Sequence, residues 1–335
     1  MGKPVFSIIV PVYNRPDEVR DLVESLVAQT ARNFELILVE DGSTVPCKAA
    51  ADAGLAAGLD ISYHHKDNDG RSIARNYGME RARGDYFIFF DSDCVIPPSY
   101  FATLEQSLAS RPLDCFGGPD AAHESFSDTQ KAINYSMTSF MTTGGIRGGR
   151  VVLEKFVPRT FNMGFSRKVY ERVGGFREMF SEDIDMSTRI RRAGFSIGLY
   201  RELPVWHKRR IDFRRFLRQV YVFGMSRITL KLLYPDSLKL VHTLPALFVA
   251  GLVAVILLAV FVSPWWLLLP AAYFAAVFAG ALISTRSLKI ALLAVPAAFV
   301  QLAGYGCGFI KAWVEKIVLG RGRNIAEEIE IRKGK

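Results

Sequence analysis

The sequence has few cysteines, and their spacing matches no metal-binding or redox motif. The four cysteines, Cys47, Cys94, Cys115 and Cys307, are scattered through 335 residues, with no C-x-x-C pair and no zinc-finger spacing. This usage indicates reduced thiols in a cytosolic or membrane protein. Only Cys94, which follows an acidic pair, stands beside residues of chemical interest.

Charged residues are nearly absent between Leu238 and Lys311. Residues 243–262 and 265–283 each supply the roughly twenty apolar residues that a membrane-spanning helix needs. A third run, 290–310, is interrupted by a proline and three glycines. We expect two full spans, with the third run partly re-entrant or interfacial, because a third full span would place the basic C-terminal tail outside.

The chain also shows no signal peptide before its first strand, so we expect the soluble part to lie in the cytosol. The formal net charge is +9, and Lys and Arg gather between Lys208 and Lys231, just before the first apolar run. Positive-inside bias and anionic lipid both favour such a cluster at a membrane. We therefore expect membrane lipid, and not nucleic acid, as the partner of these basic residues.

Two carboxylates end a buried strand in the stretch from Asp85 to Asp93. Five apolar or aromatic residues in a row lead into Asp91-Ser92-Asp93, and the chain breaks at Pro97-Pro98. Open α/β sheets bind ligands at the carboxyl ends of their strands. The pair therefore predicts a crevice that holds a divalent cation and a diphosphate, although an isolated D-x-D can also be a solvated turn.

Strands are predicted at residues 5–12, 34–39 and 61–65, with helices between them, ahead of the strand just described. This order indicates an α/β fold with a mostly parallel sheet. The sequence lacks a G-x-G-x-x-G after the first strand, where Pro11-Val12-Tyr13-Asn14 stands instead, so a nicotinamide-binding fold is excluded.

Five short motifs occur in an order that resembles the family 2 glycosyltransferases of GT-A fold. They are Ser7-Ile8-Ile9-Val10-Pro11-Val12-Tyr13-Asn14, Val39-Glu40-Asp41-Gly42-Ser43, Ala74-Arg75-Asn76-Tyr77-Gly78, Asp91-Ser92-Asp93 and Ser181-Glu182-Asp183-Ile184-Asp185. The resemblance covers about residues 4 to 230. It implies a nucleotide-sugar-binding domain, a divalent cation (Mg or Mn) and an inverting mechanism.

The resemblance also implies roles for single residues of the donor site. Pro11 and Tyr13 would line the nucleoside pocket, and Asp41 would accept a hydrogen bond from the base. Arg75 would lie near the diphosphate, with a helix-surface ion pair as the alternative. Asp91 would contact ribose or metal.

Further roles concern the metal, the sugar and the diphosphate. Asp93 would bind the metal together with His207, although a lone His is more often a packed or capping residue. Asn162 would hydrogen-bond the donor sugar or, equally, satisfy local backbone. Arg209 or Arg210 could reach the diphosphate.

The acidic cluster after Ser181 has two interpretations. Its carboxylates could simply favour the first turn of a helix capped by Ser181. An inverting transfer, however, needs a carboxylate to take the proton of the acceptor hydroxyl. The resemblance gives this role to Asp183, with Glu182 and Asp185 as supports or acceptor contacts.

The chain is thus expected to divide into a GT-A domain (1–210), amphipathic interfacial helices (211–235), a transmembrane region (236–312) and a basic tail (313–335). Residues 128–141 are a possible helix, and the glycines at 144–149 mark a candidate mobile loop. The stretch from Phe213 to Gly224 has apolar residues at helical spacing with arginines between them. It lacks the Q-x-x-R-W of processive relatives, which puts processivity in doubt.

These observations predict a multi-pass enzyme of the inner (cytoplasmic) membrane, with its catalytic domain on the cytosolic side. It would move a sugar from a UDP or GDP donor to a hydroxyl of a lipid-linked oligosaccharide or polysaccharide. Two alternatives stay open: a polyprenyl-phosphate acceptor, which needs no base, and a catalytically silent membrane scaffold.

Overall fold

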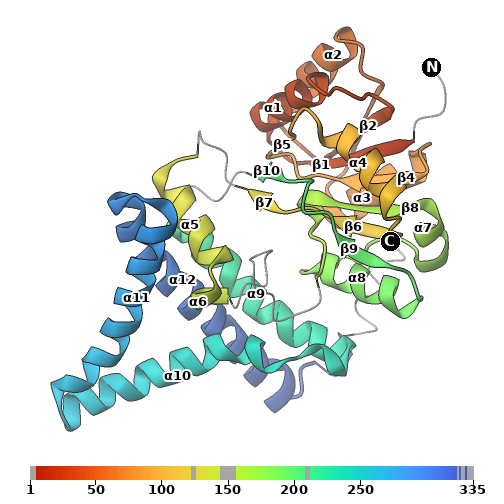
Figure 1. Ribbon diagram of the computed structural model, residues 1–335. Helices are drawn as coiled ribbons and strands as arrows, with labels where there is room; N and C mark the ends of the chain where they lie inside the picture. The colour runs from red at the N-terminus through yellow and green to blue at the C-terminus, as the bar shows by residue number, and fades with distance from the viewer. Residues whose placement is uncertain are drawn as a thin grey trace. The chain divides into compact units, whose positions relative to one another are not determined.

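The computed structural model describes residues 5–121, 126–143, 156–207 and 212–322, with residues 324, 325 and 329. These form two compact units, shown together in Figure 1. Described residues up to 121 and from 156 to 207 make the first unit, and the others make the second. The candidate mobile loop at 144–149, Arg209 and Arg210 lie outside the described residues.

The first unit is built on a seven-stranded sheet with the order β3-β2-β1-β4-β8-β6-β9 (Figure 1). Its strands are β1 (Phe6–Val12), β2 (Phe34–Asp41), β3 (Ile61–Lys66), β4 (Tyr86–Phe89), β6 (Cys115–Gly117), β8 (Met163–Ser166) and β9 (Ile197–Leu199). Only β8 runs antiparallel to its neighbours, β4 and β6. The prediction of an α/β fold with a mostly parallel sheet is therefore confirmed.

Side chains of the central strands alternate between two apolar cores, as the period of two in a strand requires. Ile8 and Val10 of β1 face one core, and Ile9 faces the other. The first core is closed by α1 (Pro16–Val27), α2 (Lys48–Ala56) and α4 (Tyr100–Ser110). The second is closed by α3 (Arg71–Arg81), α7 (Arg167–Val173) and α8 (Glu182–Arg192). The sheet is thus covered on both faces.

The residues that follow the D-x-D stretch form a strand of a second, smaller sheet. It contains β5 (Cys94–Val95), β10 (Val205–His207) and β7 (Asp120–Ala121) in the order β5-β10-β7. The antiparallel register pairs His207 with Cys94. The backbone of residue 207 is therefore held opposite the residue that follows Asp93.

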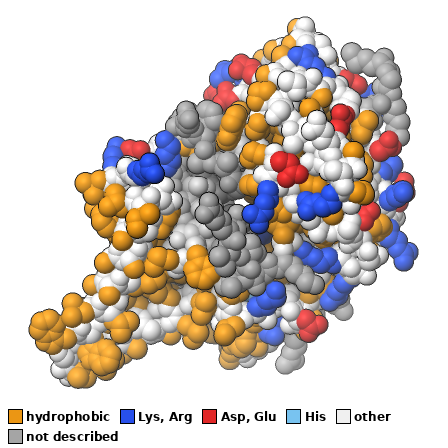
Figure 2. Space-filling model, in the orientation of Figure 1, with side chains coloured by type: hydrophobic (Ala, Val, Ile, Leu, Met, Phe, Trp, Pro, Cys, Tyr) orange, Lys and Arg blue, Asp and Glu red, His pale blue; other side chains and the backbone are white. Residues whose placement is uncertain are grey.

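The second unit is helical. Its helices are α5 (Asp128–Thr138), α6 (Phe140–Thr143), α9 (Phe213–Leu233), α10 (Leu240–Phe261), α11 (Leu268–Thr285) and α12 (Leu288–Trp313). By length and composition, three helical segments could cross a membrane: Leu240–Phe261, Pro264–Thr285 and Leu288–Val318. Figure 2 shows hydrophobic side chains crowded over the end where α10 meets α11, and Trp265 in this turn is 77% exposed.

The third apolar run forms one continuous helix, α12, despite Pro296 and its glycines. In the most apolar stretch of this segment 44% of the residues are buried within the protein, against none in the most apolar stretch of α10. Ala291 and Ala294 of α12 pack against Ala132 of α5. The helix predicted at 128–141 therefore exists, and it belongs with the apolar helices.

Candidate active site

Acidic residues collect at the carboxyl ends of neighbouring parallel strands in the first unit. Asp41 ends β2, Asp91 and Asp93 follow β4, and β1 lies between these two strands. Tyr13, just beyond β1, is 53% exposed. The structure thus brings these predicted residues to one edge of the sheet, where an open α/β fold binds its ligands.

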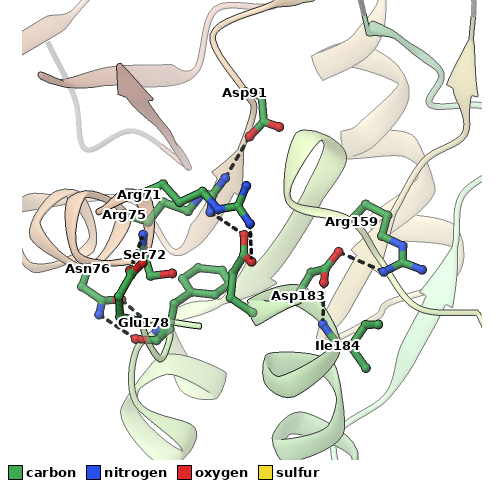
Figure 3. Close-up of polar contacts among 11 residues, drawn as sticks. Arg71, Ser72, Arg75, Asn76, Asp91, Arg159, Glu178, Asp183 and Ile184 are labelled. Atoms are coloured by element: carbon green, nitrogen blue, oxygen red, sulfur yellow. Dashed lines mark hydrogen bonds and ion pairs between the residues drawn. The ribbon is translucent and has the colours of Figure 1, made fainter. Parts of the chain in front are cut away.

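Arg75 on α3 links the D-x-D stretch to the acidic cluster (Figure 3). Its Nη2 donates to Asp91 Oδ1 at 2.8 Å, and its Nη1 donates to Glu182 Oε1 at 3.0 Å. Arg71, one turn earlier, donates to the other oxygen of Glu182 at 2.9 Å. The side chain of Arg75 is only 1% exposed, so its ion pairs are buried and do not lie on the helix surface, while its place near a diphosphate stays a prediction.

Arg71 differs from Arg75 in its exposure, since 52% of its side chain is open. It therefore presents the accessible guanidinium of this network, whereas Arg75 is enclosed between carboxylates. Sequence reasoning missed Arg71, although its position four residues before Arg75 places both on one helix face.

Asp183 lies in the first turn of α8 and is held from two sides (Figure 3). Its Oδ2 accepts a hydrogen bond from Arg159 Nη1 at 3.1 Å, and its Oδ1 accepts one from the Ile184 amide at 2.8 Å. Burial opposes ionisation, but the charge and hydrogen bond of Arg159, with the Ile184 amide, hold the pKa of Asp183 below its ordinary value. These contacts favour the ionised form of Asp183, and 13% of its side chain is exposed.

The other two carboxylates of the cluster are more enclosed than Asp183. Glu182 is 3% exposed and bridges the two arginines of α3. Asp185 is fully buried, and it receives Arg189 Nε at 2.8 Å and Arg177 Nη1 at 3.3 Å. These contacts match the predicted supporting role, while contact of either residue with an acceptor stays a prediction.

The Asp41 carboxylate organises the loop that leads into α3. It accepts hydrogen bonds from Lys66 Nζ at 2.7 Å and from the amides of Asp69 and Gly70 at 3.0 and 2.9 Å. Burial disfavours the charged lysine, but the hydrogen bonds from Lys66 to Asp41 and Asp69 hold its pKa above the usual range. A carboxylate has about four lone-pair positions. Three donors therefore leave room for the predicted hydrogen bond from a base.

Asp93 is the residue predicted to bind a metal. Its Oδ2 accepts from Arg15 Nη1 at 3.1 Å, and 14% of the side chain is exposed. Among the side chains that the structure describes, no group of three His, Cys, Asp or Glu is arranged to hold a metal ion. The His207 side chain is not one of them. The register opposite Cys94 places the backbone of residue 207 beside the stretch that carries Asp93, and a shared metal site stays a prediction.

Asn162 occupies a position that favours the local alternative. It is 1% exposed, its Oδ1 accepts from the Tyr100 hydroxyl at 2.6 Å, and its Nδ2 donates to the Leu203 carbonyl at 2.8 Å. Both ends of the amide are thus engaged within the fold. Contact with a sugar is the weaker interpretation, since it would require one of these buried hydrogen bonds to break.

Two of the non-glycine residues with positive φ stand beside this site. Asn14 follows β1 with φ 53°, and Ser181 precedes α8 with φ 65°. The Asn14 side chain accepts from the amides of Thr44 and Val45, which fixes the segment after β2. Left-handed backbone costs roughly 1–3 kcal/mol and concentrates at functional sites. The left-handed residues thus lie at the end of the motif that contains β1 and at the start of the acidic cluster on α8.

Arg159 is a second residue that the sequence did not reveal. It belongs to an irregular segment before a short 3₁₀ turn (Thr160–Asn162), 24 positions from its partner Asp183. Periodicity carries no signal for such a pair, and only the folded chain brings the two side chains together.

Comparison with known proteins gives a consistent family. The model of "Glycosyl transferase family 2" matches residues 7–174. A protein of Rickettsia bellii named as an uncharacterized glycosyltransferase is 41% identical over 96 residues, which cover 29% of this chain and 14% of that protein. The Escherichia coli uncharacterized glycosyltransferase YibD is 28% identical over 200 residues, 60% of this chain and 54% of YibD. The chain thus matches less than two thirds of the length of these curated relatives.

A solved structure with a similar fold is the mannosyltransferase PcManGT from Pyrobaculum calidifontis, in complex with GDP-Man and Mn²⁺. The two share a TM-score of 0.56 and 18% sequence identity, over 94% of this chain and 89% of PcManGT. This likeness supports the fold described above.

Proposed function

This chain belongs to glycosyl transferase family 2, whose model matches half of it, and we propose that it is a membrane-anchored inverting glycosyltransferase. It would transfer a sugar from a nucleoside-diphosphate donor to a hydroxyl of a lipid-linked oligosaccharide or polysaccharide. The observation that carries the proposal is the Asp183 carboxylate, kept ionised by Arg159 and standing next to Glu182 of the arginine network.

In the proposed reaction, Asp183 takes the proton from the acceptor hydroxyl as its oxygen bonds to the anomeric carbon of the donor sugar. The bond between that carbon and the diphosphate oxygen breaks at the same time, on the opposite face. Arg71 is the exposed cation closest in the chain to the enclosed Arg75, and its guanidinium suits a diphosphate oxygen. Arg75 and Glu182 act as positioning residues, because they fix Asp91 and Arg71.

Asp93 and His207 would hold a divalent cation, Mg²⁺ or Mn²⁺, which would neutralise negative charge on the leaving diphosphate. PcManGT, with GDP-Man and Mn²⁺, provides an example of this donor class and cation on a similar fold. In this chain, Asp41, Pro11 and Tyr13 would bind the nucleoside.

The membrane assignment rests on the three apolar segments of the second unit. We propose an inner-membrane protein whose catalytic unit faces the cytosol, since basic residues gather ahead of α10. A site kept at the cytosolic leaflet favours an acceptor that is itself carried by lipid.

A polyprenyl-phosphate acceptor is a second candidate, which the position of Arg159 favours. Its side chain is 22% exposed, and its guanidinium could bind an acceptor phosphate. Such an anionic acceptor would need no base, so Asp183 would then be dispensable.

The test is transfer or donor hydrolysis by the solubilised full-length protein, over a panel of UDP- and GDP-sugars with Mn²⁺. We expect Asp183→Asn to lower turnover by roughly 10² to 10⁴-fold while nucleotide binding persists. Asp93→Ala should lose metal-dependent activity. Asp52→Asn is the matched control, since Asp52 is an exposed carboxylate on α2 paired only with Lys48 among the described contacts.

Three outcomes separate the candidates. Loss of turnover with retained nucleotide binding in Asp183→Asn supports the base. Full turnover by Asp183→Asn would remove the base and favour a polyprenyl-phosphate acceptor. Absence of nucleotide binding by the native chain would favour the scaffold alternative.

A further inference from the structure

A groove of about 1050 Å³ opens on the second unit, between the start of α9 and the middle of α12. Its lining residues are Asp212, Arg214, Arg215, Leu217, Arg218, Tyr221, Ala303, Gly304 and Cys307. All of them come from these two helices and the residue that caps α9. The groove is therefore a feature of the helical unit alone, separate from the carboxylates of the candidate active site.

Close contact between α9 and α12 shapes the groove. Every fourth residue of α9 is buried at Phe216, Val220 and Gly224, so this face packs inward. A Cβ on Gly308 would collide with the Tyr221 carbonyl, and one on Gly304 would lie 2.6 Å from Val220. Glycines therefore let the two backbones approach, and the small residues Ala303 and Gly304 leave a recess beside the contact.

Charge on the rim of the groove is strongly unbalanced. Among the described lining residues Asp212 is the one carboxylate, and it is engaged: it caps α9 through the Arg215 amide at 2.7 Å and pairs with Arg215 Nε at 3.4 Å. Arg214 and Arg218 are both exposed, and neither has an ion-pair partner among the residues that the structure describes. Two guanidinium groups thus face the groove mouth without a counter-charge.

The floor of the groove is apolar and continues along a membrane-type helix. Leu217 is 44% exposed, and Ala303 and Gly304 belong to a segment apolar enough to span a bilayer. Guanidinium groups bind phosphate through paired N–H donors, and small apolar residues accept a hydrocarbon chain. A soluble anion would contact only the arginines of the rim, whereas an amphiphile would contact both these arginines and the apolar floor.

We infer that this groove binds an anionic membrane phospholipid, with the phosphate between Arg214 and Arg218 and an acyl chain over Leu217, Ala303 and Gly304. The inference is independent of the donor and acceptor proposed above. It concerns a lipid held at one place on α9, beyond the general attraction of a basic helix to a charged membrane.

The exposed thiol of Cys307 provides the measurement. Cys47, Cys94 and Cys115 are buried, so alkylation of the folded protein reports on Cys307. The native chain is placed in nanodiscs of phosphatidylcholine, with and without phosphatidylglycerol, and maleimide labelling rates are compared. We expect labelling to slow in the anionic nanodiscs, because a bound lipid covers the thiol.

The variant Arg214→Gln/Arg218→Gln should remove this protection. It should also weaken the affinity for phosphatidylglycerol by roughly thirtyfold, because each substitution removes one charge interaction with the lipid. Its charge-matched control is Arg172→Gln/Arg201→Gln, at exposed positions of the first unit. Equal labelling in both nanodiscs would overturn the inference. So would equal protection of the two double variants, or full protection by inorganic phosphate in phosphatidylcholine nanodiscs.

Discussion

The arginines of the candidate active site and those of the α9 groove differ in how their charge is balanced. In the first unit Arg71, Arg75 and Arg159 each contact a carboxylate within 3.1 Å. At the groove, Arg214 and Arg218 have no such partner among the described residues. Arginine therefore holds carboxylates in place in the candidate active site, whereas at the groove two arginines are available to bind a ligand.

The difference follows from burial. An arginine as enclosed as Arg75, 1% exposed, must be neutralised by protein groups, because an uncompensated charge in the interior costs several kcal/mol. An exposed arginine on α9 is stabilised by water and needs no partner to fold. The closed ion network thus fixes a preorganised scaffold, whereas the exposed arginines beside the apolar recess stay available to an anionic ligand.

Removing Arg75 should produce the largest effect on stability. Arg75→Met leaves Asp91 and the buried Glu182 short of a counter-charge, and we expect the free energy of unfolding to fall by about 3–5 kcal/mol. Urea unfolding of the solubilised full chain measures this change. Lys48→Met, at the exposed Lys48–Asp52 pair, is the control and should cost about 0–1 kcal/mol. Equal losses in the two variants would show that burial does not separate these ion pairs.

Arg159→Met should shift the pH dependence of activity. Burial alone raises the pKa of Asp183, and the variant removes the arginine that overcomes it, so the pKa should rise. Because the base must be ionised, the acid limb of the kcat/KM profile moves to higher pH, while activity returns at alkaline pH. Arg159→Lys, which keeps the charge, is the control.

The same change has a defined sign for stability. The depressed pKa of Asp183 contributes stability above the unfolded-state pKa, and this contribution disappears as pH falls through the folded-state value. Arg159→Met should therefore lose stability at neutral pH and differ less from the native chain in acid. A uniform drop in turnover at every pH would instead indicate that Arg159 contacts the substrate.

Local sequence patterns predicted the elements and the strand-end carboxylates well. Alternation and apolar runs located β1, β2 and β4, and strand ends then placed Asp41, Asp91 and Asp93 on one edge of the sheet. These features depend on residues close together in the chain, which is what hydrophobic periodicity reports.

Local patterns could not predict contacts between residues that lie far apart in the sequence. Nothing in the sequence links Arg159 to Asp183, or Ala132 of α5 to Ala291 of α12. Hydropathy marked the runs of both α10 and α12 as apolar, but it did not show that α12 is far more buried within the protein than α10. Burial of an apolar helix depends on what packs against it, so composition alone cannot separate a lipid-facing helix from a protein-facing one.

The smallest effect on stability is expected at the groove, where Arg214→Gln/Arg218→Gln should change the free energy of unfolding by no more than about 0.5 kcal/mol. Both side chains are exposed and have no ion-pair partner in the described parts of the chain, so their removal leaves no buried charge behind there. Unfolding in a neutral detergent measures the protein contribution without lipid.

A loss as large as that of Arg75→Met would mean that these arginines hold the fold together, and the contrast between the two regions would then fail. A small difference between native chain and variant in detergent that grows when phosphatidylglycerol is added to both would identify the stabilising group as the lipid. A ligand bound only by the folded state stabilises that state, and the gain increases with the ratio of its concentration to its Kd.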